Sequence, residues 1–261
     1  VYEIGPRFRN EGISEEHLPE HIAMEFYWAY ADWQDGMKFI QELFRFVYNK
    51  VYGTLKFTIR GFNIDLASNW EKINYTSVMK DCYGIDVFHT NLEEIRKILK
   101  GKKIKFDGDL NVNRGIDLLW KLIRKDIGGP AFLVGEPKFL SPLAKSDTEN
   151  PLITQRFHPI IGGFELGNGF SELNDPEDQL SRFLEQQRLR DSGDKEAQML
   201  DIDFVEMLEY GMPPTFGYGH SERNFWVFEG APAKDCVPFP LMRHSVSELT
   251  KDIYPDIYKK E

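Results

Sequence analysis

Three stretches of the sequence hold polar side chains at positions where a plain strand or helix pattern expects apolar ones. In the first stretch, Arg9 and Glu11 end one extended segment, and Glu25 and Tyr27 lie on the segment that follows it. An arginine offers a fixed, charged fork that suits a phosphate or a carboxylate, and a glutamate opposite it suits an ammonium group. The alternative interpretation is a cross-strand salt bridge between Arg9 and Glu25 on a solvated face.

The second stretch covers residues 162–179 and combines carboxylates, an amide and glycines. Alternation along an extended chain puts Asn168, Phe170 and Glu172 on one face. Glu165 is out of step with them, so we expect a bulge at the intervening glycines that re-aims its side chain. Such a set can bind a cation, a metal or an amine. The alternative is a glycine-rich edge strand with solvated acids.

The third stretch, residues 211–228, places several glycines before Arg223, in the first turn of the helix that is expected next. Glycines let a backbone approach a ligand closely, and an arginine at that position can reach a polyphosphate. The stretch has neither the Gly-Lys-Ser/Thr of a Walker loop nor the spacing of a dinucleotide fingerprint. An ordinary turn is the alternative. No Ser-His-Asp or Cys-His arrangement has motif support elsewhere.

Alternation and punctuation predict the elements that must position these residues. Residues 1–30 are predicted to form a long antiparallel hairpin. A helix with apolar residues at 3,4 spacing follows over residues 37–51 and ends at Gly53, and a strand pair over residues 54–65 follows the helix. The second strand of the hairpin has an apolar face opposite to that of Glu25 and Tyr27, on Ile22, Met24, Phe26 and Trp28.

The rest of the chain alternates helices with short strands. Residues 67–129 have a polar, helical pattern, clearest at 93–99 and 114–127, and we expect a small helical insertion there. The remaining predicted elements are short strands at 132–134 and 139–140, a second hairpin at 155–161 and 164–173, helices at 174–190 and 203–210, and short segments at 221–229 and 239–242. Long hairpins interleaved with helices predict an α+β fold.

Composition excludes several classes of protein. The 261 residues include 32 Lys and Arg against 42 Asp and Glu, a net charge of −10, and the mean hydropathy is −0.44. No apolar run is long enough for a transmembrane helix, and the acidic balance argues against a surface that grips nucleic acid throughout. Two unpatterned cysteines favour a reducing cytoplasm over a disulfide framework or a zinc site. The chain starts at Val1 without a signal peptide, so we expect it to begin inside a longer sequence.

The order of several segments resembles that of class II lysyl-tRNA synthetases. The segments are VYEIGPRFRNEGIS, MEFYWAYADW, SPLAK, GFELGNGFSELNDPEDQ, LEYGMPPT and VPFPLMR. The similarity extends from Val1 to about Arg243. It implies an antiparallel sheet flanked by helices, the class II synthetase catalytic fold. Residues 1–66 and 130–261 would form the catalytic domain, and residues 67–129 would be a helical insertion between its second and third motifs.

The resemblance also implies a reaction. In this family the lysine carboxylate attacks the α-phosphate of ATP to give lysyl-adenylate and pyrophosphate, and the lysyl group then passes to the terminal ribose of tRNA(Lys). Such a reaction needs charge neutralisation and orientation more than acid-base work. Implied with it are Mg²⁺, contact with the acceptor end of tRNA(Lys), a homodimer for the complete protein, and a cytoplasmic location without membrane contact.

The functional residues of the family carry over to all three stretches. For ATP the resemblance implies Arg9 at the α-phosphate and the lysine carboxylate, Glu11 at the adenine amino group, His17 near the outer phosphates, His21 under adenine, and Arg223 on adenine and the γ-phosphate. Arg9 and Arg223 are the implied catalytic residues. For lysine it implies Glu25, Tyr27 and Glu172 around the ε-ammonium, Phe170 along the alkyl stem and Asn168 at the carboxylate; for a metal ion it implies Glu165 and Asn168. Two carboxylates and a phenol around one ammonium select lysine, because an uncharged isostere leaves buried charge unpaired.

Several positions depart from the family pattern. The first metal-binding carboxylate aligns with His158, a poor ligand for a hard cation, and Leu18 replaces an expected Asn. The third motif is one residue short, with Glu222 in place of Asp before Arg223. The first class II motif, a carboxylate for the lysine α-amino group and the anticodon-binding barrel would lie upstream of Val1, so we expect the chain alone to be weakly stable or to aggregate. Two other functions stay open. One is a paralogue that joins a lysine-like amino acid to a protein side chain, and the other is a lysine- and ATP-binding module that has lost catalysis.

Overall fold

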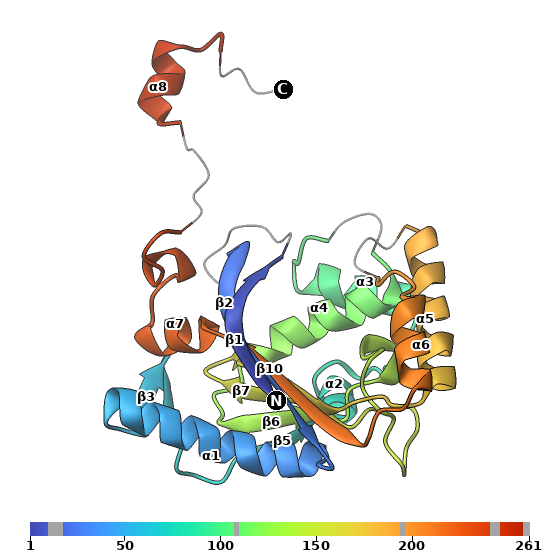
Figure 1. Ribbon diagram of the computed structural model, residues 1–261. Coiled ribbons are helices and arrows are strands. Elements are labelled where there is room, and N and C mark those ends of the chain that lie inside the picture. Colours follow the sequence, from blue (N-terminus) through green and yellow to red (C-terminus); the bar gives the residue numbers. More distant parts are fainter. Residues whose placement is uncertain (10–17, 107–109, 194–196, 241–245, 258–261) are drawn as a thin grey trace.

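An eight-stranded sheet forms the centre of the molecule (Figure 1). The computed structural model spans residues 1–261 and describes all of them except 10–17, 107–109, 194–196, 241–245 and 258–261. The strand order is β1-β2-β10-β9-β7-β6-β5, with β8 paired to β7. Their bounds are β1 (Tyr2–Phe8), β2 (Glu20–Ala29), β5 (Glu71–Asn74), β6 (Ala131–Val134), β7 (Arg156–Ile161), β8 (Phe164–Glu165), β9 (Asn168–Ser171) and β10 (Thr215–Ser221). All pairs are antiparallel except β5 with β6, so the sheet is mixed and the predicted α+β class is confirmed.

The first hairpin forms as its alternation predicts. β1 and β2 pair antiparallel, with Glu3 opposite Glu25. Phe26 of β2 packs edge-on against Phe216 of β10, with ring centroids 5.8 Å apart. The apolar face of β2 therefore lies against the core, and Glu25 lies on the other face because neighbouring side chains of a strand alternate.

Helix α1 (Trp33–Tyr52) packs against β7, β9 and β10. Asp32 caps its N-terminus by accepting hydrogen bonds from the backbone N–H groups of Gln34 and Asp35. Gly53 ends the helix at a φ of 68°, as predicted. The buried stripe of α1 has the spacing of one helix face and includes Met37, Ile40, Phe44 and Tyr48.

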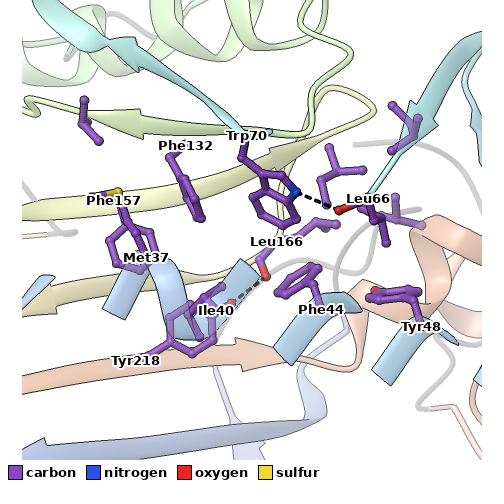
Figure 2. Close-up of a cluster of buried hydrophobic side chains, with 14 of the residues drawn as sticks. Met37, Ile40, Phe44, Tyr48, Leu66, Trp70, Phe132, Phe157, Leu166 and Tyr218 are labelled. Atoms are coloured by element: carbon purple, nitrogen blue, oxygen red, sulfur yellow. Dashed lines mark hydrogen bonds between the residues drawn. The ribbon is translucent and has the colours of Figure 1, made fainter. Parts of the chain in front are cut away.

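The main core lies between α1 and the sheet (Figure 2). The Phe44 and Trp70 rings are 5.5 Å apart, and those of Phe132 and Phe157 are 5.2 Å apart. The Trp70 indole N–H donates to Leu66 O at 3.3 Å, a bond that Figure 2 shows. Burial of each such side chain stabilises the fold by roughly 1.5–3 kcal/mol. This core covers one face of the sheet, and Glu25 lies on the opposite face.

Three helices lie between β5 and β6 in the chain, and they confirm the helical pattern predicted within residues 67–129. They are α2 (Tyr75–Tyr83), α3 (Leu92–Gly101) and α4 (Val112–Arg124), and they share a second core that extends onto Leu133 and Ile160 of the sheet. Residues 67–129 are not helical throughout, because β5 lies within them and pairs in parallel with β6. β5 is short and Ile73 is its one apolar residue, so it gives no alternation signal.

The C-terminal part is mostly helical. It contains α5 (Pro176–Asp191), α6 (Ile202–Glu209), α7 (Arg223–Glu229), the short 3-10 turn η2 (Ala233–Asp235) and α8 (Glu248–Ile253). α5 lies where a helix is predicted over residues 174–190, and Asp175 caps it by accepting hydrogen bonds from the backbone N–H groups of Glu177 and Asp178. The small hairpin of β3 (Lys56–Ile59) and β4 (Phe62–Asp65) is also as predicted. In the described part of the chain, no helix is both long and apolar enough to span a bilayer.

The structure differs from the predictions at three places. The residues expected as a strand at 139–140 lie in the 3-10 turn η1 (Lys138–Leu140), which follows Pro137. No strand is predicted at residues 215–221, where the structure has β10, because two glycines hide the strand pattern there. The short segment predicted at 239–242 has no regular structure at Phe239 and Pro240, and its other two residues lie outside the described ones.

Candidate functional site

A cavity of about 650 Å³ lies on the face of the sheet that carries Glu25, lined by residues of β1, β2, β7, β9 and β10. Every described residue that the resemblance assigns to a site lines this cavity, namely Arg9, His21, Glu25, Tyr27, Glu165, Asn168, Phe170, Glu172 and Arg223. Glu11 and His17 lie outside the described residues. The structure thus brings the three polar stretches together, and the role of each side chain stays a prediction.

Two glycines of β10 form the floor at one end of the cavity. Gly217 lies opposite Tyr27 of β2, and a Cβ atom at this position would collide with Glu172 Oε1. Gly219 lies opposite Glu25, where a Cβ atom would be 3.1 Å from the Glu25 Cγ atom. Because β10 has no side chains here, the two carboxylates and the phenol can converge over it.

The Glu172 carboxyl is buried next to a second acidic group. Burial raises its pKa to about 8, and the negative charge of Glu25 adds to the shift. The pKa of the Tyr27 phenol is also raised, first by burial and then by the charges of Glu172 and Glu25. Among the residues that the structure describes, no cationic side chain forms a salt bridge with Glu172. This acidic end of the cavity therefore suits a ligand that carries an ammonium group.

Glu25 has an internal partner that sequence reasoning misses. Arg7 Nη2 lies 3.2 Å from Glu25 Oε2, and Arg7 Nη1 lies 3.1 Å from Glu3 Oε1. The alternative interpretation, a salt bridge between Glu25 and Arg9, is therefore wrong, because Glu25 pairs with Arg7 instead. The Arg9 N–H donates to Pro19 O at 2.8 Å, which places Arg9 near the turn of the hairpin, far along β2 from Glu25. The available signal was the alternation that puts Glu3 and Arg7 on one face of β1.

The opposite end of the cavity is basic. Arg9 lies just beyond β1, and Arg223 is the first residue of α7, directly after β10 and Glu222. Glu222 Oε1 accepts a hydrogen bond from the Ile22 N–H at 3.1 Å, which ties the start of α7 to β2. Two arginines with His21 nearby form a set that suits a polyphosphate.

Buried charged side chains form a network in the wall of the cavity. Glu136 Oε2 lies 3.1 Å from His158 Nε2 and 3.3 Å from Arg156 Nε. Arg156 also donates from Nε to Asn168 Oδ1 at 2.8 Å and from Nη1 to Ser141 Oγ at 2.7 Å. Sequence reasoning misses Glu136 and Arg156. Alternation could have indicated Arg156, since it shares a face of β7 with His158.

Glu165 is re-aimed by a break in its strand, as predicted. β8 and β9 are separated at Gly167, whose φ is 156°. The Trp120 indole N–H donates to Glu165 Oε1 at 2.5 Å, and Arg124 Nη1 lies 3.5 Å from Glu165 Oε2. Burial alone would raise the pKa of Glu165, but the charges of His158 and Arg124 and the bond from Trp120 outweigh burial and lower it.

The residues that the resemblance assigns to a metal ion do not fit one as they lie. Both oxygens of Glu165 face N–H donors, and the side-chain oxygen of Asn168 accepts from Arg156. Mg²⁺ needs several oxygen ligands, and one carboxylate that is already paired with an arginine supplies too few of them. The part of the chain that the structure describes has no group of three or more His, Cys, Asp or Glu side chains that could hold a metal ion. The carboxylates of the wall are neutralised by side chains instead.

The mixed sheet with helices on both sides, and the cavity with one acidic and one basic end, are consistent with a class II aminoacyl-tRNA synthetase catalytic fold. Residues 1–243 match the family of tRNA synthetases class II (D, K and N), and the chain belongs to this family.

Among curated proteins, the chain is similar to several enzymes named lysine–tRNA ligase. It is 43% identical to the one from Fervidobacterium nodosum over an alignment of 265 residues. This alignment covers 100% of this chain and 51% of that protein. It is 43% identical over 248 residues to the one from Thermotoga maritima and 39% identical over 247 residues to the one from Roseiflexus sp. strain RS-1, with 93% of this chain covered in each case. The chain spans about half the length of these relatives.

Proposed function

We propose that this chain is the part of a lysine–tRNA ligase that binds lysine and ATP and joins them as lysyl-adenylate. The observation that carries the proposal is the acidic end of the cavity, where Glu25, Tyr27 and Glu172 converge over the glycine floor of β10. The names of relatives at 43% identity support it. Because the chain spans about half of their length, the activity of a complete enzyme, including transfer to tRNA(Lys), is part of the proposal.

Lysine matches the distribution of charge along the cavity. Its ε-ammonium is proposed to lie between Glu172 and Glu25, with its alkyl stem along Phe170 and its carboxylate toward Arg9 and Asn168. A neutral amino acid of the same length could neither replace the proton of Glu172 nor pair with the charge of Glu25, so it would lose both ion pairs. The site should therefore reject isosteres that lack the positive charge.

ATP is proposed to bind at the basic end. The adenine would lie between His21 and Arg223, and Glu11 and His17 would supply further contacts. An oxygen of the lysine carboxylate attacks the α-phosphorus, the bond from that phosphorus to the bridging oxygen breaks, and pyrophosphate leaves. Arg9 would neutralise the charge that builds on the α-phosphate. No general base is needed, because the nucleophile is already a carboxylate, and positioning supplies much of the rate.

Exchange of labelled pyrophosphate into ATP tests the proposal, because it requires lysine-dependent formation of the adenylate. Arg9→Ala and Glu172→Ala are expected to lower exchange by more than about 100-fold. Glu185→Ala is the matched control, since it removes an exposed carboxylate of α5 that pairs with Arg188. Exchange that survives both site substitutions would contradict the site assignment. Lysine binding without any exchange would indicate a binding module that has lost catalysis.

The acceptor and the assembly are also proposals. We expect labelled lysine to appear on the acceptor end of tRNA(Lys), whereas label on a protein side chain would favour the paralogue. We propose a homodimer, which light scattering can test, and a cytoplasmic location. Cys82 and Cys236 are both free thiols, which fits a reducing compartment. Mg²⁺ enters this proposal as the counter-ion of ATP in solution, because the residues around Glu165 do not fit it.

A further inference from the structure

His158 is buried between two hydrogen-bond acceptors. Its Nε2 lies 3.1 Å from Glu136 Oε2, its Nδ1 lies 3.1 Å from the Gly167 carbonyl oxygen, and its side chain is 11% exposed. A neutral imidazole donates from one nitrogen, so one of these contacts would set a lone pair against a lone pair. The imidazolium form donates to both acceptors. In that form the ring would place a positive charge in the wall of the cavity.

Two arginines complete the set of cations around the buried carboxylates. Arg156 Nε lies 3.3 Å from Glu136 Oε2, and Arg124 Nη1 lies 3.5 Å from Glu165 Oε2. Burial alone would raise the pKa of Glu136, but the charge of Arg156 and the hydrogen bond and charge of His158 outweigh burial and lower it. Both carboxylates are thus ionised and neutralised from within the protein. With His158 in the imidazolium form, three cationic groups would face two carboxylates and give this wall a surplus positive charge.

A divalent cation needs the opposite arrangement. Mg²⁺ binds to oxygen atoms whose lone pairs are free, and an imidazolium offers no lone pair and repels the ion. His158 stands where the family resemblance implies a metal-binding carboxylate. Arg156, His158 and Glu165 line the same cavity, so a polyphosphate there would be exposed to the surplus positive charge of this wall.

We propose that this protein carries a built-in cation, the His158 imidazolium together with Arg156 and Arg124, at the place where the family implies a metal ion on Glu165. The phosphates of a nucleoside triphosphate then bind along this wall without a divalent cation held by the protein. The second statement rests on the proposed function, whereas the exclusion of a metal ion from Glu165 stands without it.

Binding of Mn²⁺ alone to the full chain, measured as loss of the free-ion EPR signal, tests the exclusion. We expect Glu165→Gln to leave the titration of the wild type unchanged. The double variant Glu136→Gln, His158→Glu puts a carboxylate beside Glu165 without a second carboxylate at 136, and we expect it to bind one Mn²⁺ at least about tenfold more tightly than the wild type. The proposal is overturned by wild-type binding that Glu165→Gln removes, and equally by a folded double variant that binds no better. If the double variant does not fold, the comparison of wild type with Glu165→Gln decides.

Calorimetric titration with ATP, in excess Mg²⁺ and in excess EDTA, tests the second statement. The affinities of the wild type for ATP in Mg²⁺ and in EDTA are expected to agree within about threefold. The substitution His158→Gln should weaken ATP binding in EDTA by about tenfold. His89→Gln is the matched control, since His89 is an exposed histidine that pairs with Asp86. If the wild type binds ATP more than about tenfold more tightly in Mg²⁺ than in EDTA, the statement is overturned. Absence of ATP binding in both solutions would overturn the proposed function instead, and the Mn²⁺ titration would still decide the exclusion.

Discussion

Arg7 Nη2 lies 3.2 Å from Glu25 Oε2, across the first hairpin of the sheet. At the same end of the cavity, burial and the charge of Glu25 raise the pKa of Glu172 to about 8. The two carboxylates of the proposed lysine site thus start from different states. Glu25 is paired with an arginine, and Glu172 is mostly protonated at neutral pH. The ammonium of lysine has to compete with Arg7 for the first and replace a proton on the second.

Arg7→Met is expected to strengthen lysine binding by about two- to fivefold, because it removes the internal competitor for Glu25 and keeps an aliphatic stem. The effect is small since the side chains of Arg7 and Glu25 are 28% and 47% exposed to solvent. Calorimetric titration with lysine measures it. Arg188→Met breaks an exposed ion pair with Glu185 on α5 and should leave the affinity unchanged. Weaker binding by Arg7→Met would mean that Arg7 positions Glu25 for the ligand.

Lysine binding is expected to release a proton. Below its pKa of about 8, Glu172 must lose its proton to face an ammonium, so the affinity should rise by up to about tenfold per pH unit between pH 6 and 8. Above pH 8 it should level off until the lysine ε-amine, with a pKa of about 10.4, loses its own proton. Titrations in buffers of different ionisation enthalpy count the released proton. A dissociation constant that does not vary with pH, with no proton released, would contradict the prediction.

Glu172 should also make the stability of the ligand-free fold depend on pH. Its pKa is about 8 in the folded protein, against an ordinary value of 4.5, so between these values the folded state holds a proton that the unfolded state has lost. Stability therefore falls as the pH rises from about 4.5 to about 8. Glu172→Gln cannot ionise, and we expect it to be about 2–4 kcal/mol more stable than the wild type at pH 9 and similar at pH 5. Urea unfolding at both pH values measures this, and equal stabilities at pH 9 would be the contrary result.

Period-2 alternation predicts the faces of the site strands well. Along β9 it puts Asn168 and Phe170 on the face of Glu172, and the structure has all three in the lining of one cavity. The break that re-aims Glu165 also follows from the sequence, because a glycine at 167 can take the φ of 156° that the turn requires. Local patterns set these positions, so the sequence is sufficient to predict them.

Contacts between distant strands are harder to predict. The pairing of Glu136 with His158 depends on β6 lying beside β7, and the glycine floor depends on β10 lying between β2 and β9. The pattern around Gly217 and Gly219 predicts no strand, because glycine has little strand propensity. The glycines that hide β10 in the sequence are the ones that make room for the acidic end. Local patterns do not predict that Arg223 lies in the same cavity as Glu25, and the family resemblance does.

Gly217→Ala tests this floor directly. A Cβ atom at position 217 would collide with Glu172 Oε1 and lie 3.0 Å from the Tyr27 ring, so the carboxyl must turn away from the proposed ammonium position. Lysine affinity should fall by more than about tenfold, since a charged partner of the ammonium is displaced. Gly101→Ala is the matched control, because no atom lies within 4 Å of its added Cβ. Calorimetry measures the affinity, and a thermal melt verifies that both variants are folded. Lysine binding of wild-type strength in folded Gly217→Ala would contradict the placement of the ammonium beside Glu172.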